Sequence, residues 1–120
     1  VLIIASGLMT MRALEAAKQL RKDNVSVAVL HSPTIKPLDE ETILAQAATP
    51  GRLVIVAENH SSDGGMCEAV ASLLMRNRVN VDFDTVALPD AFLDAGALPT
   101  LHDRYGISTT AMVEKIRRRL

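Results

Sequence analysis

The sequence has 120 residues, of which 48% are hydrophobic and 22% are charged, and its formal net charge is −1. A chain of this length forms one domain with a core of its own, so we treat residues 1–120 as a single domain. The balanced charge gives no sign of a nucleic-acid partner, and no apolar run reaches the ~20 residues that a membrane span needs.

The cysteine content and the first residue bear on where the protein acts and how it is organised. Cys67 is the only cysteine, which excludes an internal disulfide and favours a reducing, cytoplasmic location. Val1 already lies inside a strand-like run, with neither an initiator methionine nor a signal peptide before it. We therefore expect this domain to be excised from a longer enzyme.

The chain opens with a predicted strand and helix. Residues 1–5 are continuously apolar and β-branched, as expected for a strand that is buried on both faces, and Gly7 supplies the turn after it. Residues 11–22 are predicted to form a helix, because apolar residues recur about one turn apart. The stripe expected to face the sheet consists of Met11, Leu14, Ala17 and Leu20.

The second strand is predicted at residues 25–31, and two prolines then hold the connection extended. Asp39 is expected to cap the next helix, since an N-cap aspartate accepts a backbone hydrogen bond. Glu40 and Glu41 in the first turn suit the positive end of that helix. Pro50-Gly51 should end it.

The third strand, residues 53–57, is the most apolar and is expected near the centre of the sheet. A helix from about Gly65 to Asn77 follows, and it should bury Met66, Ala69 or Val70, Leu73 and Leu74. Residues 81–88 alternate polar and apolar at their start, which predicts a strand nearer an edge.

The last third of the chain is predicted to contain a loop, a short helical turn and a closing helix. The loop is marked by Pro89, Gly96 and Pro99, and the turn 101–105 ends at Gly106. Ser108 or Thr109 is expected to cap the closing helix. Its buried stripe should be Met112, Val113, Ile116 and Leu120.

Alternation of strands with helices, without an internal repeat, predicts βαβ crossovers and a mostly parallel sheet. We expect an α/β fold in three layers, with helices on both faces of the sheet. In such sheets, ligands bind beyond the carboxyl ends of the strands.

One such strand end carries the strongest candidate site. Glu58, Asn59 and His60 end the third strand, and Gly64-Gly65 opens the next helix. These residues form a possible anion or interface site, because free N–H groups at a helix start attract anions. The pair is not a complete phosphate-binding motif, so a glycine corner that permits close packing is the favoured alternative.

No catalytic, cofactor-binding or metal-binding residue is identified. Glu58 and His60 could act as an acid–base pair, but alternate strand residues point to opposite sides, so Glu58 better suits backbone N–H groups or a facing subunit. Cys67 has no evident base and orienting partner, and we interpret it as a buried thiol. The basic run 117–119 is expected to interact with its helix dipole, rather than to bind phosphate.

Five stretches at matching separations resemble the C-terminal domain of transketolase-like thiamine diphosphate enzymes. They are "ASG…ALEAAKQL", "IKPLDEETI", "VAENHSSDGGMCEAVASLL", "ALPDAFLDAG" and "LHDRYGIS". This group includes transketolase, 1-deoxyxylulose-5-phosphate synthase and the beta subunits of 2-oxoacid dehydrogenases. The resemblance covers about Leu2 to Ile116 and departs from many relatives at Asn59, often acidic, and at Cys67, often glycine.

The resemblance implies a three-layer α/β/α domain with a five-stranded, mostly parallel sheet, although only four strand segments are evident. It also implies that thiamine diphosphate and Mg²⁺ are bound by other domains of the parent enzyme, whose G-D-G…N motif does not occur here. The domain is then expected to contact those other domains and a second subunit of a homodimer. No catalytic residue carries over by position.

Three functions follow from these observations. The leading hypothesis is a structural and dimer-assembly domain of an enzyme that transfers two-carbon ketol units between sugar phosphates. A domain of 1-deoxyxylulose-5-phosphate synthase or of a 2-oxoacid dehydrogenase beta subunit is an alternative, and the motifs favour the transketolase and synthase groups. The third is a self-standing nucleotide- or phosphometabolite-binding regulatory module that uses Gly64-Gly65.

Overall fold

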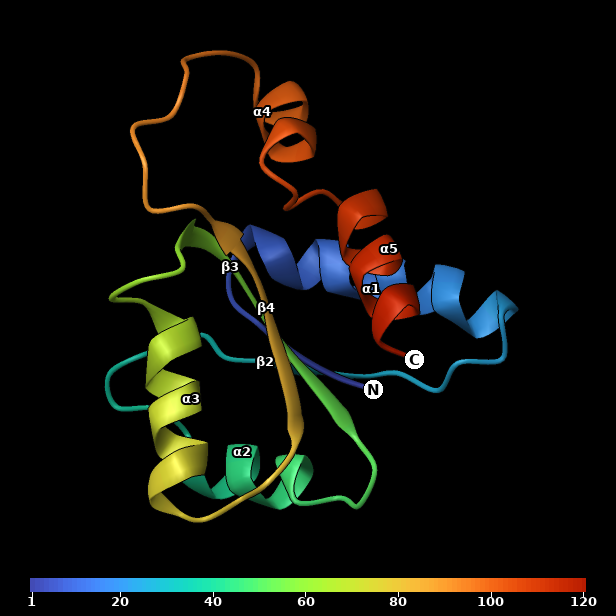
Figure 1. Cartoon of the computed structure of the whole chain (residues 1–120), viewed down its shortest axis with the longest axis vertical. Helices are drawn as coiled ribbons and strands as arrows, with labels where there is room; N and C mark the ends of the chain where they lie inside the picture. Colours follow the sequence, from blue (N-terminus) through green and yellow to red (C-terminus); the bar gives the residue numbers. More distant parts are fainter.

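The computed structural model describes all of residues 1–120 and has a mixed α/β architecture (Figure 1). Strands and helices alternate up to the fourth strand, after which two helices close the chain. The elements in chain order are β1 (Leu2–Ala5), α1 (Leu8–Lys22), β2 (Ala28–His31), α2 (Glu40–Ala47), β3 (Leu53–Ser61), α3 (Met66–Arg76), β4 (Asp82–Leu88), α4 (Leu98–Arg104) and α5 (Thr109–Arg119).

The sheet has four parallel strands in the order β2-β1-β3-β4. The central position of β3 and the edge position of β4 are as predicted. The fifth strand implied by the family resemblance is absent. The chain after β4 instead runs through an exposed loop that contains Pro89, and proline lacks the N–H group that a strand ladder requires.

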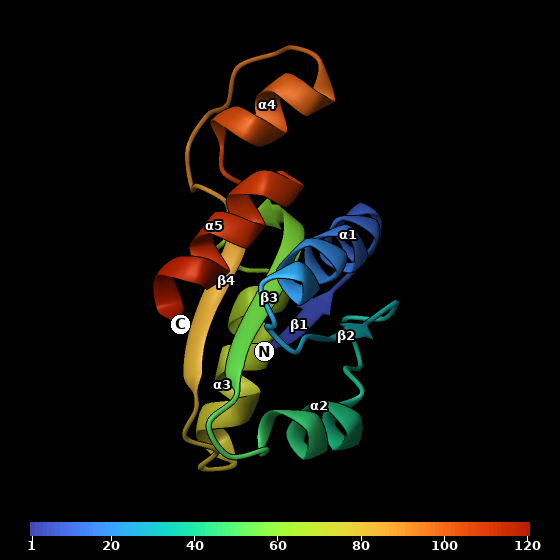
Figure 2. The same cartoon turned by 90° about the vertical axis from the view of Figure 1, so that its right-hand side faces the viewer.

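Helices cover both faces of the sheet, which confirms the three-layer arrangement (Figure 2). On one face, α1 and α5 bury Met9, Leu20 and Ile116 against the sheet. On the other face, α2 and α3 bury Ile43 and Leu73. Each face has its own apolar core, so the central strands β1 and β3 are sealed from water on both sides over most of their length, whereas β2 and β4 stay partly exposed.

The inward face of α1 agrees with the prediction at Ala17 and Leu20 and differs from it at Met11 and Leu14. Met11 and Leu14 are exposed, at 67% and 44% of their surface. The buried residues of this helix are Met9, Ala13, Ala16, Ala17 and Leu20. Alanines let the helix axis approach the sheet closely, and the bulkier stripe is left facing outward.

Helix caps and element ends mostly follow the sequence. Asp39 accepts a hydrogen bond from the backbone N–H of Thr42 at 3.1 Å, which lowers the pKa of its carboxyl group. Ser108, rather than Thr109, caps α5 by accepting the N–H of Ala111 at 3.2 Å. Leu120 is exposed, in contrast to its predicted burial.

Four element boundaries differ from the predicted ones, and the first is the start of α1, which begins at Leu8 rather than at residue 11. The strand β2 is shorter than residues 25–31, and β3 continues four residues beyond Ala57 to Ser61. The helix α4 already begins at Leu98, ahead of the predicted turn. Within α3, Val70 is the buried member of the predicted pair, whereas Ala69 is partly exposed.

A segment that we name the arm, residues 89–104, extends away from the body of the domain (Figure 1). It comprises the loop after β4 and the helix α4. Residues 89–100 are all exposed, and His102 is the only buried residue of the arm. Asp94 holds the arm in shape, because its carboxylate pairs with Arg104 at 2.5 Å and its N–H donates to the Tyr105 hydroxyl at 3.0 Å.

Candidate functional site

The carboxylate of Glu58 lies against the first turn of α3. Glu58 is buried, and its two oxygens accept the backbone N–H groups of Met66 and Cys67 at 2.9 and 2.7 Å. These donors belong to a helix start that has no side-chain cap of its own. A negative group at this position also interacts favourably with the helix dipole. Glu58 therefore accepts backbone N–H groups, as predicted.

Gly65 leaves the space that the carboxylate fills. A Cβ atom at this position would lie 2.5 and 2.7 Å from the two Glu58 oxygens, which is closer than van der Waals contact allows. The preceding Gly64 has a different requirement, since its φ of +78° favours glycine while the space around it is open. The two glycines thus have separate functions in one corner.

A second carboxylate occupies the same turn. Glu68 accepts the N–H of Gly64 at 2.7 Å, and the Ser61 hydroxyl accepts the N–H of Asp63 at 3.2 Å. Three N–H groups at the start of α3 and in the loop before it therefore already bind carboxylates of the same chain. An external anion would compete with these internal partners.

Cys67 is buried directly behind this corner, as predicted. Its thiol contacts the carbonyl of Val56 at 3.6 Å. Burial raises the pKa of the Cys67 thiol far above its ordinary value, and the neighbouring Glu58 raises it further. Because the thiolate is the nucleophile, this cysteine is held in its unreactive form.

Asn59 and His60 lie on the exposed tip of β3. The pairing of β3 with β4 is interrupted between Ala57 and Ser61, so this tip leaves the regular ladder. The His60 imidazole contacts only the carbonyl of Ser61, at 3.0 Å through Nδ1. The structure thus separates the candidate residues: Glu58 and Gly65 form a closed internal contact, whereas Asn59 and His60 face outward.

The end of β2, which is separated from β3 by β1, carries a shallow opening of about 360 Å³ beside His31, Ser32 and Pro37. His31 is exposed and shares a hydrogen bond with the Thr10 hydroxyl at 2.8 Å. The Ser32 hydroxyl is buried and donates to the Thr34 carbonyl at 3.3 Å. These polar groups already have partners within the chain.

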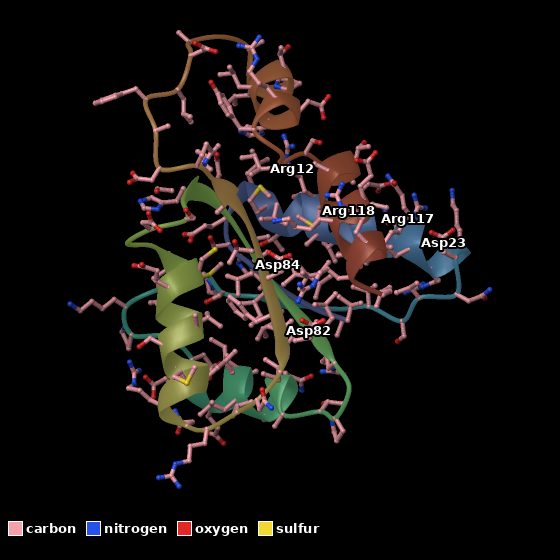
Figure 3. The ribbon with its side chains drawn as sticks, in the orientation of Figure 1. Arg12, Asp23, Asp82, Asp84, Arg117 and Arg118 are labelled. Atoms are coloured by element: carbon pink, nitrogen blue, oxygen red, sulfur yellow. The ribbon has the colours of Figure 1, made fainter.

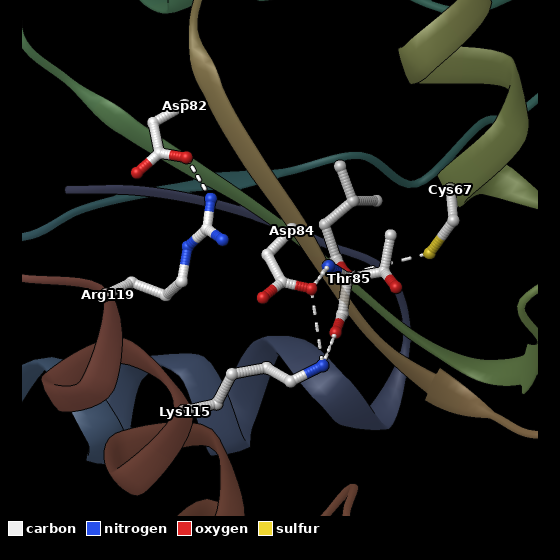
Figure 4. Close-up of polar contacts among 7 residues, drawn as sticks. Cys67, Asp82, Asp84, Thr85, Lys115 and Arg119 are labelled. Carbon is white, nitrogen blue, oxygen red and sulfur yellow. Dashed lines mark hydrogen bonds and ion pairs between the residues drawn. The ribbon is translucent and has the colours of Figure 1, made fainter.

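The basic end of α5 forms ion pairs that the sequence did not reveal. Arg117 binds Asp23 at the end of α1 at 2.6 Å, and both side chains lie on the same side of the molecule in Figure 3. Arg119 pairs with Asp82 at the start of β4 (Figure 4). Two of the three arginines in residues 117–119 therefore tie α5 to its neighbours.

Lys115, one turn before Arg119, joins the same strand. It donates to the carboxylate of Asp84 at 3.3 Å and to the carbonyl of Thr85 at 2.6 Å (Figure 4). Asp82 and Asp84 alternate along β4, and Lys115 and Arg119 are four residues apart on α5. That matching spacing of acids on a strand and bases on a helix was the available signal for this contact.

His102 is the other feature that sequence reasoning missed. It is 3% exposed, and its Nδ1 has no hydrogen-bond partner. Burial lowers the pKa of His102, and the positive charge of Arg12 lowers it further. Arg12 itself donates to the Ile107 carbonyl at 3.2 Å, next to the base of the arm. An isolated histidine gives no sign of this environment in the sequence.

Neither a metal centre nor a membrane span is evident in the structure. No group of three or more His, Cys, Asp or Glu side chains could hold a metal ion. We assign the residues of this chain no step of thiamine diphosphate chemistry. No helix combines the length and apolar character needed to cross a bilayer.

Comparison with known proteins identifies the family. The protein-family model described as "Transketolase, C-terminal domain" matches residues 1–112 of this chain. The chain belongs to this family. A transketolase family protein of Sinorhizobium fredii, y4mN, is 66% identical over 117 residues, which are 97% of this chain and 34% of that protein. A 1-deoxy-D-xylulose-5-phosphate synthase of Heliobacterium modesticaldum is 35% identical over 120 residues, all of this chain and 18% of the synthase.

The fold of this transketolase C-terminal domain also matches a solved structure. A split-gene transketolase, described as an inactive beta4 tetramer, superposes with a TM-score of 0.88 at 32% identity. The match covers 98% of this chain and 38% of the solved one. The chain thus spans about a third or less of the y4mN and synthase relatives. The transketolase and synthase names are those that the sequence motifs favoured.

Proposed function

We propose that residues 1–120 form the C-terminal domain of a longer thiamine diphosphate-dependent enzyme that transfers two-carbon ketol units between sugar phosphates. Its function there is to pack against the other domains and to assemble a homodimer in the cytoplasm. The observation that carries this proposal is the closed corner between β3 and α3. At the edge where sheets of this type bind ligands, the N–H groups of Met66 and Cys67 are already bound by Glu58.

The outward-facing parts of the same edge support an assembly role. Phe92 in the arm is fully exposed, and Leu93 and Leu98 of the same segment are also exposed, at 37% and 57%. A loop with aromatic and aliphatic side chains in solvent is typical of a surface that another protein surface covers. Asn59 and His60 stand at this edge and supply polar groups for the rim of such a contact.

In this proposal, the chemistry belongs to the cofactor and to the other domains of the longer enzyme. The cofactor of thiamine diphosphate enzymes supplies the carbanion chemistry, while the protein supplies binding and orientation. In the proposed enzyme, Mg²⁺ and thiamine diphosphate are bound outside these 120 residues. The chain covers only about a third of y4mN. In a longer protein of that kind, the remaining two-thirds has room for those sites.

Calorimetry tests this proposal. Thiamine diphosphate with Mg²⁺, titrated into the 120-residue chain, should give no binding heat in the micromolar range. In the longer protein, deletion of residues 1–120 should abolish ketol transfer together with dimer formation. Micromolar binding of the cofactor to the chain alone would contradict the proposal.

A thermal-shift panel of nucleotides and sugar phosphates separates the assembly domain from a regulatory module. A ligand that binds only the folded state raises the melting temperature by mass action. The assembly role predicts no shift across the panel. A shift that is lost in Gly65→Val would favour the regulatory module instead.

A further inference from the structure

One side of the domain is apolar and unpaired over two adjacent elements, α1 and β2. The outward stripe of α1 contains Leu8, Met11 and Leu14, all exposed. Beside it, Val27 and Val29 on the β2 side are only partly buried. Figure 2 shows α1 and β2 on the same outer side of the sheet, opposite β4. We name these five residues the α1–β2 face.

The α1–β2 face is hollowed into a groove of about 430 Å³. Its floor is apolar, with Ala17 in addition to Met11, Leu14 and the two valines. Its rim is formed by Glu15, Lys18 and Arg21. An apolar centre with a charged rim is the usual anatomy of a specific protein interface.

The strand β2 adds an open sheet edge to this surface. Ala28 donates to the Val1 carbonyl on the β1 side, so the alternate residues Val27 and Val29 direct their backbone groups outward. Exposed edges usually carry charges or prolines that prevent pairing. Residues 25–31 contain no Lys, Arg, Asp, Glu or Pro, so this edge is not protected in that way.

We propose that the α1–β2 face binds a second copy of this chain across a two-fold axis, with α1 packed on α1 and the two β2 edges side by side. This assignment rests on the proposed assembly role and names the surface that performs it. A two-fold contact sets each surface against itself, so its rim must carry both charges. Glu15 pairs with Lys18 of its own helix at 3.3 Å, but at 52% exposure its carboxylate stays accessible, and Lys18 and Arg21 provide the bases that the other copy's acid can meet.

Sedimentation velocity across the micromolar range tests the proposal with a matched pair of variants. Met11→Lys places a charge at the centre of the face, whereas Met75→Lys makes the same change on α3, where Met75 is 78% exposed. The wild-type chain and Met75→Lys should dimerise equally, and Met11→Lys should raise the dimer Kd at least roughly tenfold. Both residues are exposed, so circular dichroism should show the native fold in each variant.

A charge-exchange experiment identifies the partner as a second copy. Lys18→Glu/Arg21→Glu makes the rim acidic, and Glu15→Lys makes it basic. Each variant alone should dimerise more weakly than wild type, and an equimolar mixture should form a heterodimer tighter than either homodimer. No preference for the mixed dimer would overturn the assignment of the rim.

Two results of these experiments would contradict the proposed α1–β2 face. A wild-type chain that stays monomeric throughout, or a dimer that Met11→Lys leaves intact, would overturn the proposed face. Neither result would touch the proposed function, which fails only if the chain binds the cofactor itself or if the longer enzyme works without it. Assembly of the longer enzyme through another surface would leave that function standing.

Discussion

The β3–α3 corner and the arm stand at the same edge of the domain but use their polar groups in opposite ways. In the corner, Glu58 binds two backbone N–H groups at the start of α3, and Glu68 of α3 binds the N–H of Gly64 in the loop before it. In the arm, the one carboxylate with partners, Asp94, only holds the arm's own shape. The arm is attached to the body by a single buried side chain, His102, which lacks a hydrogen-bond partner.

This difference teaches how to separate a scaffold from a contact surface in such a domain. A buried carboxylate that satisfies a helix start stabilises the fold and leaves little for an outside ligand. An exposed aromatic residue contributes almost nothing to the fold and is available to a partner. Mutations in the corner should therefore change stability, and mutations of the exposed side chains of the arm should change only association.

Among the variants that test this difference, Glu58→Ala should cause the largest loss of stability. It leaves the N–H groups of Met66 and Cys67 buried without an acceptor and removes a packed side chain. We expect a loss of about 3 kcal/mol or more in the free energy of unfolding. Urea denaturation of the purified chain measures it, with Glu68→Ala, at the exposed side of the same turn, as a control that costs less. Equal losses in the two variants would show that burial of Glu58 is not decisive.

Gly65→Ala should be next in size. The added Cβ displaces the Glu58 carboxylate, which can move only by giving up its hydrogen bonds, and we expect a loss of about 2 kcal/mol. Gly64→Ala is the matched control, since it meets no atom within 4 Å but has a positive φ and should cost about 1 kcal/mol. The reverse order in urea denaturation would mean that backbone conformation, not carboxylate space, determines this corner.

His102→Leu tests the anchor of the arm through pH. The folded-state pKa of His102 is below its ordinary value of 6.5, so folding favours the neutral ring. The contribution of His102 to the free energy of unfolding is therefore complete above pH 6.5. It is lost as the pH falls below 6.5 and through the lower folded-state pKa. We expect His102→Leu to remove this part of the pH dependence and to stay within about 1 kcal/mol of wild type at pH 7.

The melting temperatures of wild type and His102→Leu are measured between about pH 7.5 and 5, a range that includes the ordinary pKa of histidine. Asp39 does not interfere, because its lowered pKa makes its own contribution fade only below the ordinary carboxyl value of 3.8. Wild type and His102→Leu losing stability in parallel over this range would contradict the assignment of the acid sensitivity to His102.

Phe92→Ser should have the smallest effect on the fold. The side chain has no burial to lose, so the free energy of unfolding should change by less than about 0.5 kcal/mol. In the proposed longer enzyme, the same change should reduce ketol transfer or weaken assembly, because a partner covers the ring. A destabilised chain, or a longer enzyme that is unaffected in both respects, would remove the arm from the list of contact surfaces.

The order of the elements and the parallel sheet could be predicted, because apolar strand runs and helix caps are local signals. Asp39 and Gly106 marked helix ends correctly for that reason. The orientation of α1 was not predicted, because stripes through Met9 and through Met11 fit the helical period equally well. Only the close approach of the alanines to the sheet distinguishes them.

The candidate site shows the same division between local and tertiary information. Glu58 and Gly65 were found as a pair of features at a strand end and a helix start. Their mutual dependence was not visible, because it rests on a contact across six intervening residues that forms only when β3 and α3 pack. The partnerless nitrogen of His102 and the ion pairs of α5 also depend on elements far apart in the sequence.

Phosphate titration followed by amide NMR tests most directly the claim that the β3–α3 corner is closed to outside ligands. Inorganic phosphate and then pyrophosphate are added to the labelled chain, and the amide resonances of Gly64, Met66 and Cys67 are recorded. Because Glu58 and Glu68 already bind these amides, we predict no saturable shift at any of the three. Saturable shifts of these three amides together, lost in Gly65→Val, would show that the corner is an anion site and would contradict the account.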